Sequence, residues 1–317
     1  MGSDIIMTIF GSESVITHHI ANAKLHTYFV GFDLDDTGEK VYRWSSLIDK
    51  LLEVIPEFAF GFHDGTSTSN TQLIGKVRDA ARSIYKIDEF QRVKDLYLNN
   101  GHLADDVHDK YLRRGEFGEL ILHLLLRDFH STVPLISKIY FKDSYGHTVH
   151  GFDAVHIEPK SKTLWLGESK IYLDGKKGVS ELVKDIKEHF LRNYLNDEFT
   201  IISKKIKNFG YIPELDHWLR LLDNSTTLSE QLDFINIPLL CTYTSENFTK
   251  YNDETLAEFI KDYEEEVYEL KRYFDLKNDH PLKTNLNIIL LLFPVKSKIK
   301  LVKKLHNNLS LLQRVGG

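Results

Sequence analysis

The chain has 317 residues, a formal net charge of −6 and 42% hydrophobic residues. This length and composition predict one large or two smaller folded α/β domains that can bury a core. The single cysteine, Cys241, excludes intrachain disulfides, and no apolar run approaches the ~18 residues of a membrane span. Because no secretory signal is evident either, we expect a cytoplasmic protein that does not contact membranes. The acidity disfavours a free, non-specific DNA-binding protein, but it is compatible with a site that receives DNA from a partner.

The first part of the chain alternates between strand and helix patterns. We predict strands over residues 25–33 and 57–63, a helix over 44–55 between them, and a helical pattern over 71–99. The first helix is expected to end before Pro56, because proline lacks the backbone donor that a helix needs. Residues 63–70 are expected to form a polar loop. This alternation favours an α/β fold with a mixed sheet.

A strongly apolar helix is predicted over residues 113–129, RRGEFGELILHLLLRDF. At about 100° per residue, its apolar side chains occupy most of the circumference. Glu116 and Glu119 share the narrow remaining arc, with His123 between them. We therefore expect a helix that is buried on most sides and offers acids along one edge.

Residues 151–172, GFDAVHIEPKSKTLWLGESKIY, predict two strands joined by the turn-forming residues 159–162. Strand residues alternate between faces, so Glu168 and Lys170 are expected to point the same way. If the hairpin closes with an even-length loop, Asp153 lies directly opposite Glu168, with Cβ atoms roughly 5 Å apart.

Two carboxylates at that distance repel each other unless a positive charge lies between them. A hard divalent cation such as Mg²⁺, or Mn²⁺, prefers such oxygen ligands. Lys170 would add a fixed positive charge on the same face. An acid pair, a cation and a lysine are the parts that metal-assisted phosphodiester hydrolysis requires.

The rest of the chain continues the α/β pattern. Its predicted elements are a helix from 180 to about 194, a partly helical stretch over 203–232, core strands over 237–243 and 286–293, a long helix over 255–277 and a final helix over 298–312. The apolar run IILLLFPV at 288–295 is better explained as a buried strand than as a membrane segment.

A strand with Asp followed by a strand with Glu-x-Lys resembles the PD-(D/E)xK nuclease superfamily, although Phe152 stands where the superfamily name has proline. GEFGELILHLLLRDF, GFDAVHI and LWLGESKIY together are similar to the HamA family, the nuclease subunits of the Hachiman antiphage defence system. LHTYFVGFD and IPEFAFG also resemble early strands of that family, so the resemblance covers most of the chain.

The resemblance implies a restriction-endonuclease-like core with a mixed β-sheet flanked by helices and with α/β elaborations at both ends. The implied domains are an N-terminal α/β region over residues 1–105, packed on the core, and a nuclease domain over 106–317 with a helical C-terminal elaboration. The implied activity is metal-dependent DNA cleavage as the effector of bacterial antiphage defence. A superfamily 2 helicase, HamB, would be the partner that binds and unwinds the DNA.

The resemblance also implies roles for single residues. The implied catalytic residues are Asp153, Glu168 and Lys170 on the hairpin and Glu119 or Glu116 on the preceding helix. Asp153, Glu168, Glu119 and the carbonyl of Ser169 would hold Mg²⁺ or Mn²⁺. Lys170 would position the attacking water or stabilise the charged transition state.

Other charged groups allow further interpretations. His147, His150 and His156 make a histidine-based nuclease or a zinc site conceivable, but a solvated or core-edge role is favoured, since no second cysteine and no His-x-x-x-His pair supports zinc. His150 and His156 are expected to face opposite to Asp153. DNA phosphates could be contacted by Lys176, Lys177, Lys184 and Lys187, or these lysines could form a solvated helix face. The same alternatives hold for the lysines at 296–304, and the acids at 253–269 are either solvated or face a basic partner such as a helicase.

A rival hypothesis is a non-catalytic module that keeps the nuclease fold and docks on a helicase or on DNA. The intact aspartate and Glu-x-Lys argue against it, because a degenerate site usually loses one of them. The sequence has no GxxxxGK[ST] motif, so the chain is not expected to hydrolyse ATP itself.

Overall fold

The computed structural model describes residues 9–61, 72–84, 115–136, 151–207, 212 and 214–314. Its centre is a seven-stranded sheet with the strand order β1-β2-β9-β8-β7-β6-β5. The strands are β1 (Ile16–Asn22), β2 (Leu25–Val30), β5 (Val133–Pro134), β6 (Ala154–Glu158), β7 (Thr163–Tyr172), β8 (Ile235–Thr244) and β9 (Asn287–Val295). A separate two-stranded sheet joins β3 (Phe32–Leu34) and β4 (Lys40–Tyr42).

The middle of the large sheet is parallel, and its two edges are antiparallel. Strands β2, β9, β8 and β7 run in the same direction, whereas β1 pairs with β2, and β6 with β7, in antiparallel fashion. Strand β9 contains the run IILLLFPV, and every residue of that run is buried. Parallel strands covered on both faces need continuous apolar sequence, which explains the absence of alternation there.

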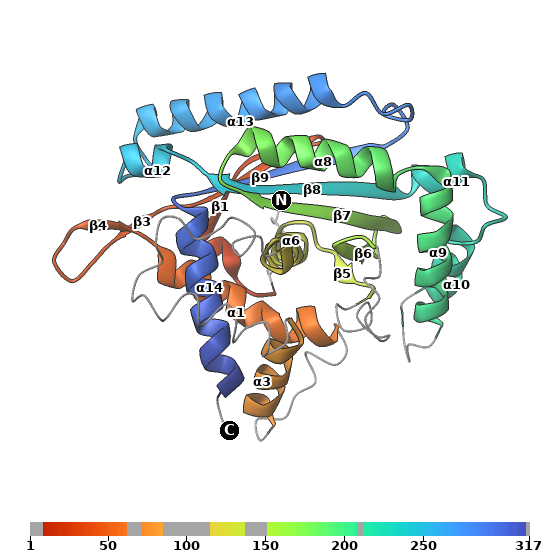
Figure 1. Cartoon of the computed structure of the whole chain (residues 1–317), viewed down its shortest axis with the longest axis horizontal. Helices are drawn as coiled ribbons and strands as arrows, with labels where there is room; N and C mark the ends of the chain where they lie inside the picture. Colours follow the sequence, from red (N-terminus) through yellow and green to blue (C-terminus); the bar gives the residue numbers. More distant parts are fainter. Residues whose placement is uncertain are drawn as a thin grey trace, which may run out of the picture.

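Helices cover both faces of the sheet (Figure 1). On one face, α8 (Gly175–His189) packs on β7 and β8, and α13 (Ala257–Lys277) packs on α8. On the other face lie α6 (Gly115–Phe129), α1 (Trp44–Phe60), α3 (Leu73–Ile84) and α14 (Lys298–Arg314). The shorter elements are η1 (Ser12–Ser14), α9 (Arg192–Ile206), α10 (Leu215–Leu221), α11 (Leu228–Asp233) and α12 (Asn247–Lys250). The predicted α/β fold with a mixed, helix-flanked sheet is confirmed.

The N-terminal elements depart from the prediction in two places. Residues 57–60 are helical rather than extended, because α1 continues through Pro56 to Phe60. The apolar side chains Ile55, Phe58 and Ala59 are buried, and that burial offsets the backbone hydrogen bond that proline removes. Strand β1 was not predicted, since its sequence ITHHIAN has a weak apolar pattern and a mixed burial pattern.

The region after the hairpin also differs from the prediction. Two helices replace the expected single helix over 180–194: α8, which begins earlier at Gly175, and α9, which starts at Arg192. The Asp174 side chain caps α8 by accepting a hydrogen bond from the backbone N–H of Lys177 at 3.0 Å.

Residues 62–71, 85–114 and 137–150 lie outside the described part of the chain. The predicted loop at 63–70, His147 and His150 are among these undescribed residues. The division of the chain at 105/106 stays a prediction.

Candidate active site

The hairpin of β6 and β7 brings the predicted site residues together. Its five backbone pairs run from Glu158 opposite Thr163 to Ala154 opposite Gly167. This is the register that a loop centred between residues 160 and 161 predicts, so the predicted register is confirmed. Continuing it by one residue places Asp153 opposite Glu168.

The ladder between β6 and β7 ends at Ala154, whereas β7 continues to Tyr172. Among the described strands, none pairs with this side of β7 beyond Gly167. Asp153 occupies the first position of the open edge: its Oδ2 accepts hydrogen bonds from the backbone N–H and the hydroxyl of Ser169, both at 2.8 Å. Along residues 168–172, one edge of β7 is therefore left unpaired by the described strands, next to a fixed carboxylate.

Glu168 and Lys170 point to the face of β7 that α8 covers. The carboxylate Oε1 of Glu168 lies 2.6 Å from Nδ1 of His189, and Nζ of Lys170 lies 2.5 Å from Oδ2 of Asp185. Asp185 and His189 are four residues apart on α8, which places both on one side of that helix. One helix thus holds both charged residues of the Glu-x-Lys motif.

Glu168 is 3% exposed and lies in a field with more negative than positive charge. Burial raises its pKa well above the usual value, and the charges of Asp153, Asp185 and Glu119 raise it further, whereas Lys170 lowers it. Lys170 responds in the opposite way: burial lowers its pKa, but Asp185, Glu168 and Asp153 outweigh that effect and the net pKa is raised. The site therefore keeps its lysine charged, and acids outnumber bases among the described groups that act on Glu168.

Helix α6 approaches β7 from the opposite face. A Cβ on Gly118 would lie 2.8 Å from Oγ of Ser169, and one on Gly167 would lie 2.8 Å from Cδ2 of Leu122, so both glycines are needed for the close approach. This contact brings Glu119, 7% exposed, close enough to act on Glu168 across the strand edge. Glu116, the alternative helix acid, is half-buried one turn nearer the start of α6.

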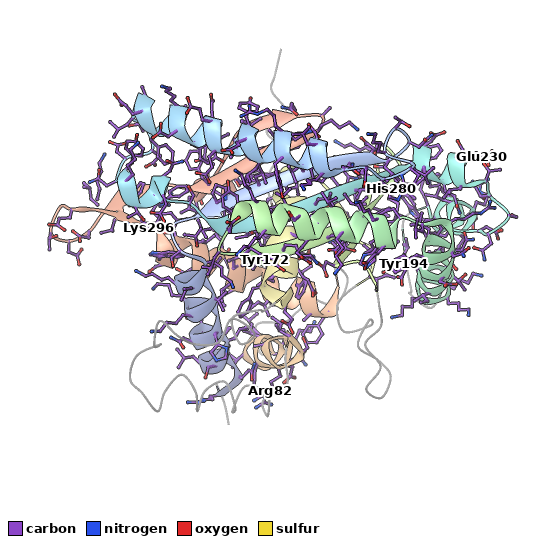
Figure 2. The ribbon with its side chains drawn as sticks, turned by 45° about the horizontal axis from the view of Figure 1, so that its top comes forward. Arg82, Tyr172, Tyr194, Glu230, His280 and Lys296 are labelled. Atoms are coloured by element: carbon purple, nitrogen blue, oxygen red, sulfur yellow. The ribbon has the colours of Figure 1, made fainter. Side chains whose placement is uncertain are left out.

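Helix α9 adds two further side chains near Glu168. The ring of Tyr194 stacks on His189 with centroids 4.6 Å apart. Glu198 is 3% exposed, and burial raises its pKa to about 7. Burial also raises the pKa of Tyr194, and the charges of Glu198 and Glu168 contribute to that shift. Figure 2 shows Tyr172 and Tyr194 near opposite ends of α8.

The carboxylate oxygens of the site are ligands of the kind that a hard divalent cation binds. In the described residues, no three histidines, cysteines and acids already converge as a metal-binding group. However, the bonds to Asp153 involve only Oδ2 and the contact of Glu168 with His189 only Oε1, so neither uses the second oxygen of its carboxylate. Carboxylate oxygens under excess negative charge are what Mg²⁺ and Mn²⁺ prefer.

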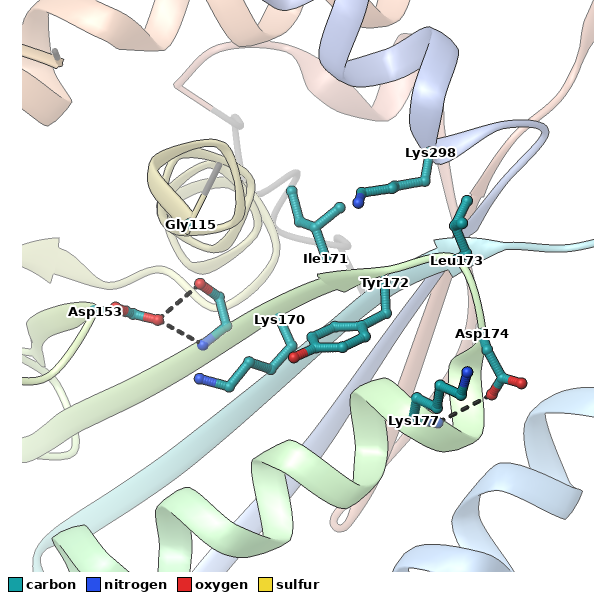
Figure 3. Close-up of a pocket in the computed structure, with 10 residues that line it drawn as sticks. Gly115, Asp153, Lys170, Ile171, Tyr172, Leu173, Asp174, Lys177 and Lys298 are labelled. Atoms are coloured by element: carbon teal, nitrogen blue, oxygen red, sulfur yellow. Dashed lines mark hydrogen bonds between the residues drawn. The ribbon is translucent and has the colours of Figure 1, made fainter. Parts of the chain in front are cut away.

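The lysines that were predicted to contact DNA divide into two groups. Lys177 lines a pocket of about 400 Å³ together with Asp153, Ser169 and Lys170 (Figure 3). Lys176 pairs with Glu269 at 2.6 Å, and Lys187 pairs with Asp279 at 2.5 Å, away from that pocket. Lys184 is exposed on α8.

His156 belongs to a different buried cluster, on the α6 face of the hairpin. Its Nε2 lies 3.2 Å from Nδ1 of His123, and Nε2 of His123 lies 3.0 Å from Oε1 of Glu57. The guanidinium of Arg127 donates to both oxygens of Glu57, at 2.5 and 3.2 Å. His156 points away from Asp153, as predicted, and its neighbours satisfy its hydrogen bonds.

The acids at 253–269 have partners within the chain. Glu266, for example, accepts hydrogen bonds from Ser245 and Asn247. The other contacts join Asp253 to Lys40, Glu254 to the backbone N–H of Phe32, Asp262 to Lys250, Glu264 to His19 and Glu269 to Lys176. These six of the run's eight acids therefore have partners within the described part of the chain, and whether the run also faces a basic partner stays a prediction.

Sequence reasoning did not identify Asp185, His189, Tyr194 or Glu198 as part of the site. The available signal was the apolar stripe of the helix after the Glu-x-Lys strand, since polar residues beside such a stripe lie near the sheet. Asp185 directly precedes the stripe residue Ile186, and His189 directly precedes Phe190. The break between α8 and α9, which brings Tyr194 and Glu198 back to the site, left no comparable signal.

Three findings bear on the class of protein to which the chain belongs. Across the described residues, no helix is both long and apolar enough to span a bilayer. A search of curated proteins finds no match. The family model for HamA matches residues 7–309, a range that includes the whole hairpin site. The chain therefore belongs to the HamA family of the Hachiman defence system.

Proposed function

We propose that the chain is a metal-dependent DNA endonuclease whose site is built around the open edge of β7. The observation that carries this proposal is the convergence of Asp153, Glu168 and Lys170, with Glu119 nearby, in a buried field of excess negative charge. Strongly shifted carboxylates with a specific charged partner are typical of functional sites.

In the reaction, a water oxygen forms a bond to phosphorus, the bond from phosphorus to the leaving oxygen breaks, and that oxygen gains a proton as the water loses one. When bound, Mg²⁺ or Mn²⁺ supplies the Lewis acidity that activates water and neutralises phosphate charge. Asp153, Glu168, the carbonyl of Ser169 and, directly or through water, Glu119 would hold that cation. Lys170 stabilises the charge that develops on the phosphate.

The side chains of α8 act by positioning the residues that touch the substrate and the cation. His189 fixes the carboxylate of Glu168, and Asp185 fixes the ammonium of Lys170. The two Ser169 donors fix Asp153 in the same way. Such supporting contacts hold reacting groups within the narrow geometry that catalysis requires.

We also infer that the chain acts as the effector of an antiphage defence system with a superfamily 2 helicase as partner. Membership of the HamA family supports this inference. The net charge of −6 agrees with a division of labour in which the partner supplies most of the DNA affinity.

The test is cleavage of plasmid and linear DNA by the purified chain, with Mg²⁺ or EDTA, alone and with the helicase. The Glu168→Ala/Lys170→Ala variant is expected to lose cleavage. The chain offers a matched control, because Glu158-Pro159-Lys160 is a second Glu-x-Lys at the turn of the same hairpin. The Glu158→Ala/Lys160→Ala variant should cleave normally. Absence of metal-dependent cleavage under all conditions would favour the docking module instead.

A further inference from the structure

The pocket beside the hairpin site extends well beyond the residues assigned to catalysis. Asp153, Ser169 and Lys170 form one end of its lining. The rest of the described lining comes from the start of α6, the end of β7, the start of α8 and one residue of α14: Gly115, Ile171, Tyr172, Leu173, Asp174, Lys177 and Lys298 (Figure 3). The pocket thus lies at the carboxyl ends of parallel strands, where open α/β sheets usually bind their ligands.

Lys298 is the residue that the fold, rather than the sequence, brings to this pocket. Strand β9 ends at Val295, and α14 begins at Lys298, whose backbone N–H donates to Oγ1 of Thr244 at 2.9 Å. Its side chain is only 2% exposed, and Figure 3 shows it directed toward Ile171 and the start of α6. A lysine is rarely buried to this degree, and here the buried lysine lines a cavity.

The charges along the pocket favour an anion at the end that Lys298 and Lys177 line. Among the described residues, three lysines and two aspartates line the pocket. Lys170 is paired with Asp185, and the carboxylate of Asp174 is bound to the α8 backbone as its cap. Lys298 and Lys177 are the two lysines of the described lining that lie outside the Glu-x-Lys motif. Lysine ammonium groups contact phosphates as point charges, without reading base sequence.

We infer that Lys298 and Lys177 form a phosphate subsite that holds the DNA backbone next to the phosphate being cleaved. The inference rests on the proposed nuclease function and names the residues that bind its substrate. At about 3.3 Å per strand residue, Tyr172 lies roughly 7 Å beyond Lys170 along β7. The subsite lies at this end of β7, so it would bind a phosphate of the DNA backbone next to the one that reacts. It keeps Lys177 from the predicted group of four lysines and adds a residue from the far end of the chain.

The experiment measures binding of a fluorescently labelled DNA duplex by the purified chain in EDTA, over a range of salt concentrations. Lys298→Gln and Lys177→Gln are each expected to weaken binding about 5- to 10-fold at low salt. Each should also reduce the slope of log affinity against log salt by roughly 1, the effect of one lost phosphate contact. Lys298→Arg, which keeps the charge, should retain most of the slope.

Lys303→Gln provides the matched control, because Lys303 is an exposed lysine on the same helix outside the pocket lining. It should keep the unsubstituted slope. Thermal unfolding of Lys298→Gln checks its fold, and the more exposed Lys177 keeps the test decisive if that variant unfolds. A free 5′-mononucleotide is added as a competitor of the duplex. The subsite inference is overturned if Lys298→Gln weakens binding of the mononucleotide but not binding of the duplex.

Two further results would contradict the subsite: unchanged slopes in both glutamine variants, or no duplex binding by the unsubstituted chain at low salt. Failure of the proposed function has a different signature. It would appear as missing metal-dependent cleavage, or as cleavage that survives the Glu168→Ala/Lys170→Ala substitutions, whatever the binding slopes show.

Discussion

The two faces of the β6–β7 hairpin each bury a glutamate beside a histidine, with a basic side chain nearby. On the α6 face, Arg127 binds both oxygens of Glu57, and His123 lies 3.0 Å from the same carboxylate. Burial raises the pKa of Glu57, but these partners outweigh burial and the net pKa is lowered. On the α8 face, Lys170 is paired with Asp185, and the pKa of Glu168 is raised.

The difference separates a structural cluster from the proposed active site. Glu57 is matched by partners that stabilise its charge, so its network holds α1 and α6 together. Glu168 is surrounded by more acids than bases, an arrangement that costs stability unless a cation joins it. Natural proteins retain such unfavourable groups at sites of function.

The largest expected effect is on the structural face. Glu57→Gln removes the charge that Arg127 requires, and breaking a buried pair in this way should lower the free energy of unfolding by about 3–5 kcal/mol. Chemical denaturation with urea measures the change. Glu57→Gln/Arg127→Met should recover part of the loss, because the double variant leaves no buried unpaired charge. Equal stability of Glu57→Gln and the unsubstituted chain would contradict the structural role.

On the functional face, His189→Gln should reduce the cleavage rate about 10- to 100-fold, the usual cost of losing a supporting contact. Stability should change little, because His189 is partly exposed. Affinity for Mn²⁺, measured by calorimetry on the purified chain, should fall as well, which a purely structural role would not cause. His217→Gln, a histidine on α10, is the control and should leave both values unchanged.

A smaller effect of opposite sign is expected for Glu168 itself. Without metal, Glu168→Gln should raise the free energy of unfolding by about 0.5–2 kcal/mol, because it removes one of several crowded negative charges. The same measurement on Glu57→Gln should move the other way. If both substitutions destabilise the chain, the contrast between the faces is wrong.

Low pH should destabilise the buried cluster that contains Glu57 and His156, and so lower the free energy of unfolding. Burial lowers the pKa of His156 well below its usual value, and the charges of His123 and Arg127 add to that effect. The unfolded chain therefore binds more protons as pH falls below about 6.5, and stability decreases from that pH downward. Between pH 7 and 5.5 we expect His156 alone to contribute a loss of roughly 1 kcal/mol, measured by thermal unfolding. His156→Gln should reduce this pH slope, and an unchanged slope would assign it to other histidines.

The sequence predicted the hairpin well because strand alternation and turn position are local properties. The positions of residues 159–162 were enough to predict the pairing that ends with Ala154 opposite Gly167, directly before Asp153 and Glu168. The continuation of α1 through Pro56 could not be predicted, since it depends on burial against α6 and on the contact between Glu57 and Arg127. Lys298 shows the same limit, because it reaches the pocket only through the order of strands in the sheet.

That strand order has a consequence for biosynthesis. Among the described strands, β9 is the last to leave the ribosome, yet it lies between β2 and β8. At about 5–20 residues per second, translation from the end of β8 to the end of β9 takes roughly 3–10 s. During that interval the nascent chain carries two half-sheets with open edges, which invite pairing with other chains. Lys298 emerges later still, so the pocket becomes complete only after the two half-sheets can join.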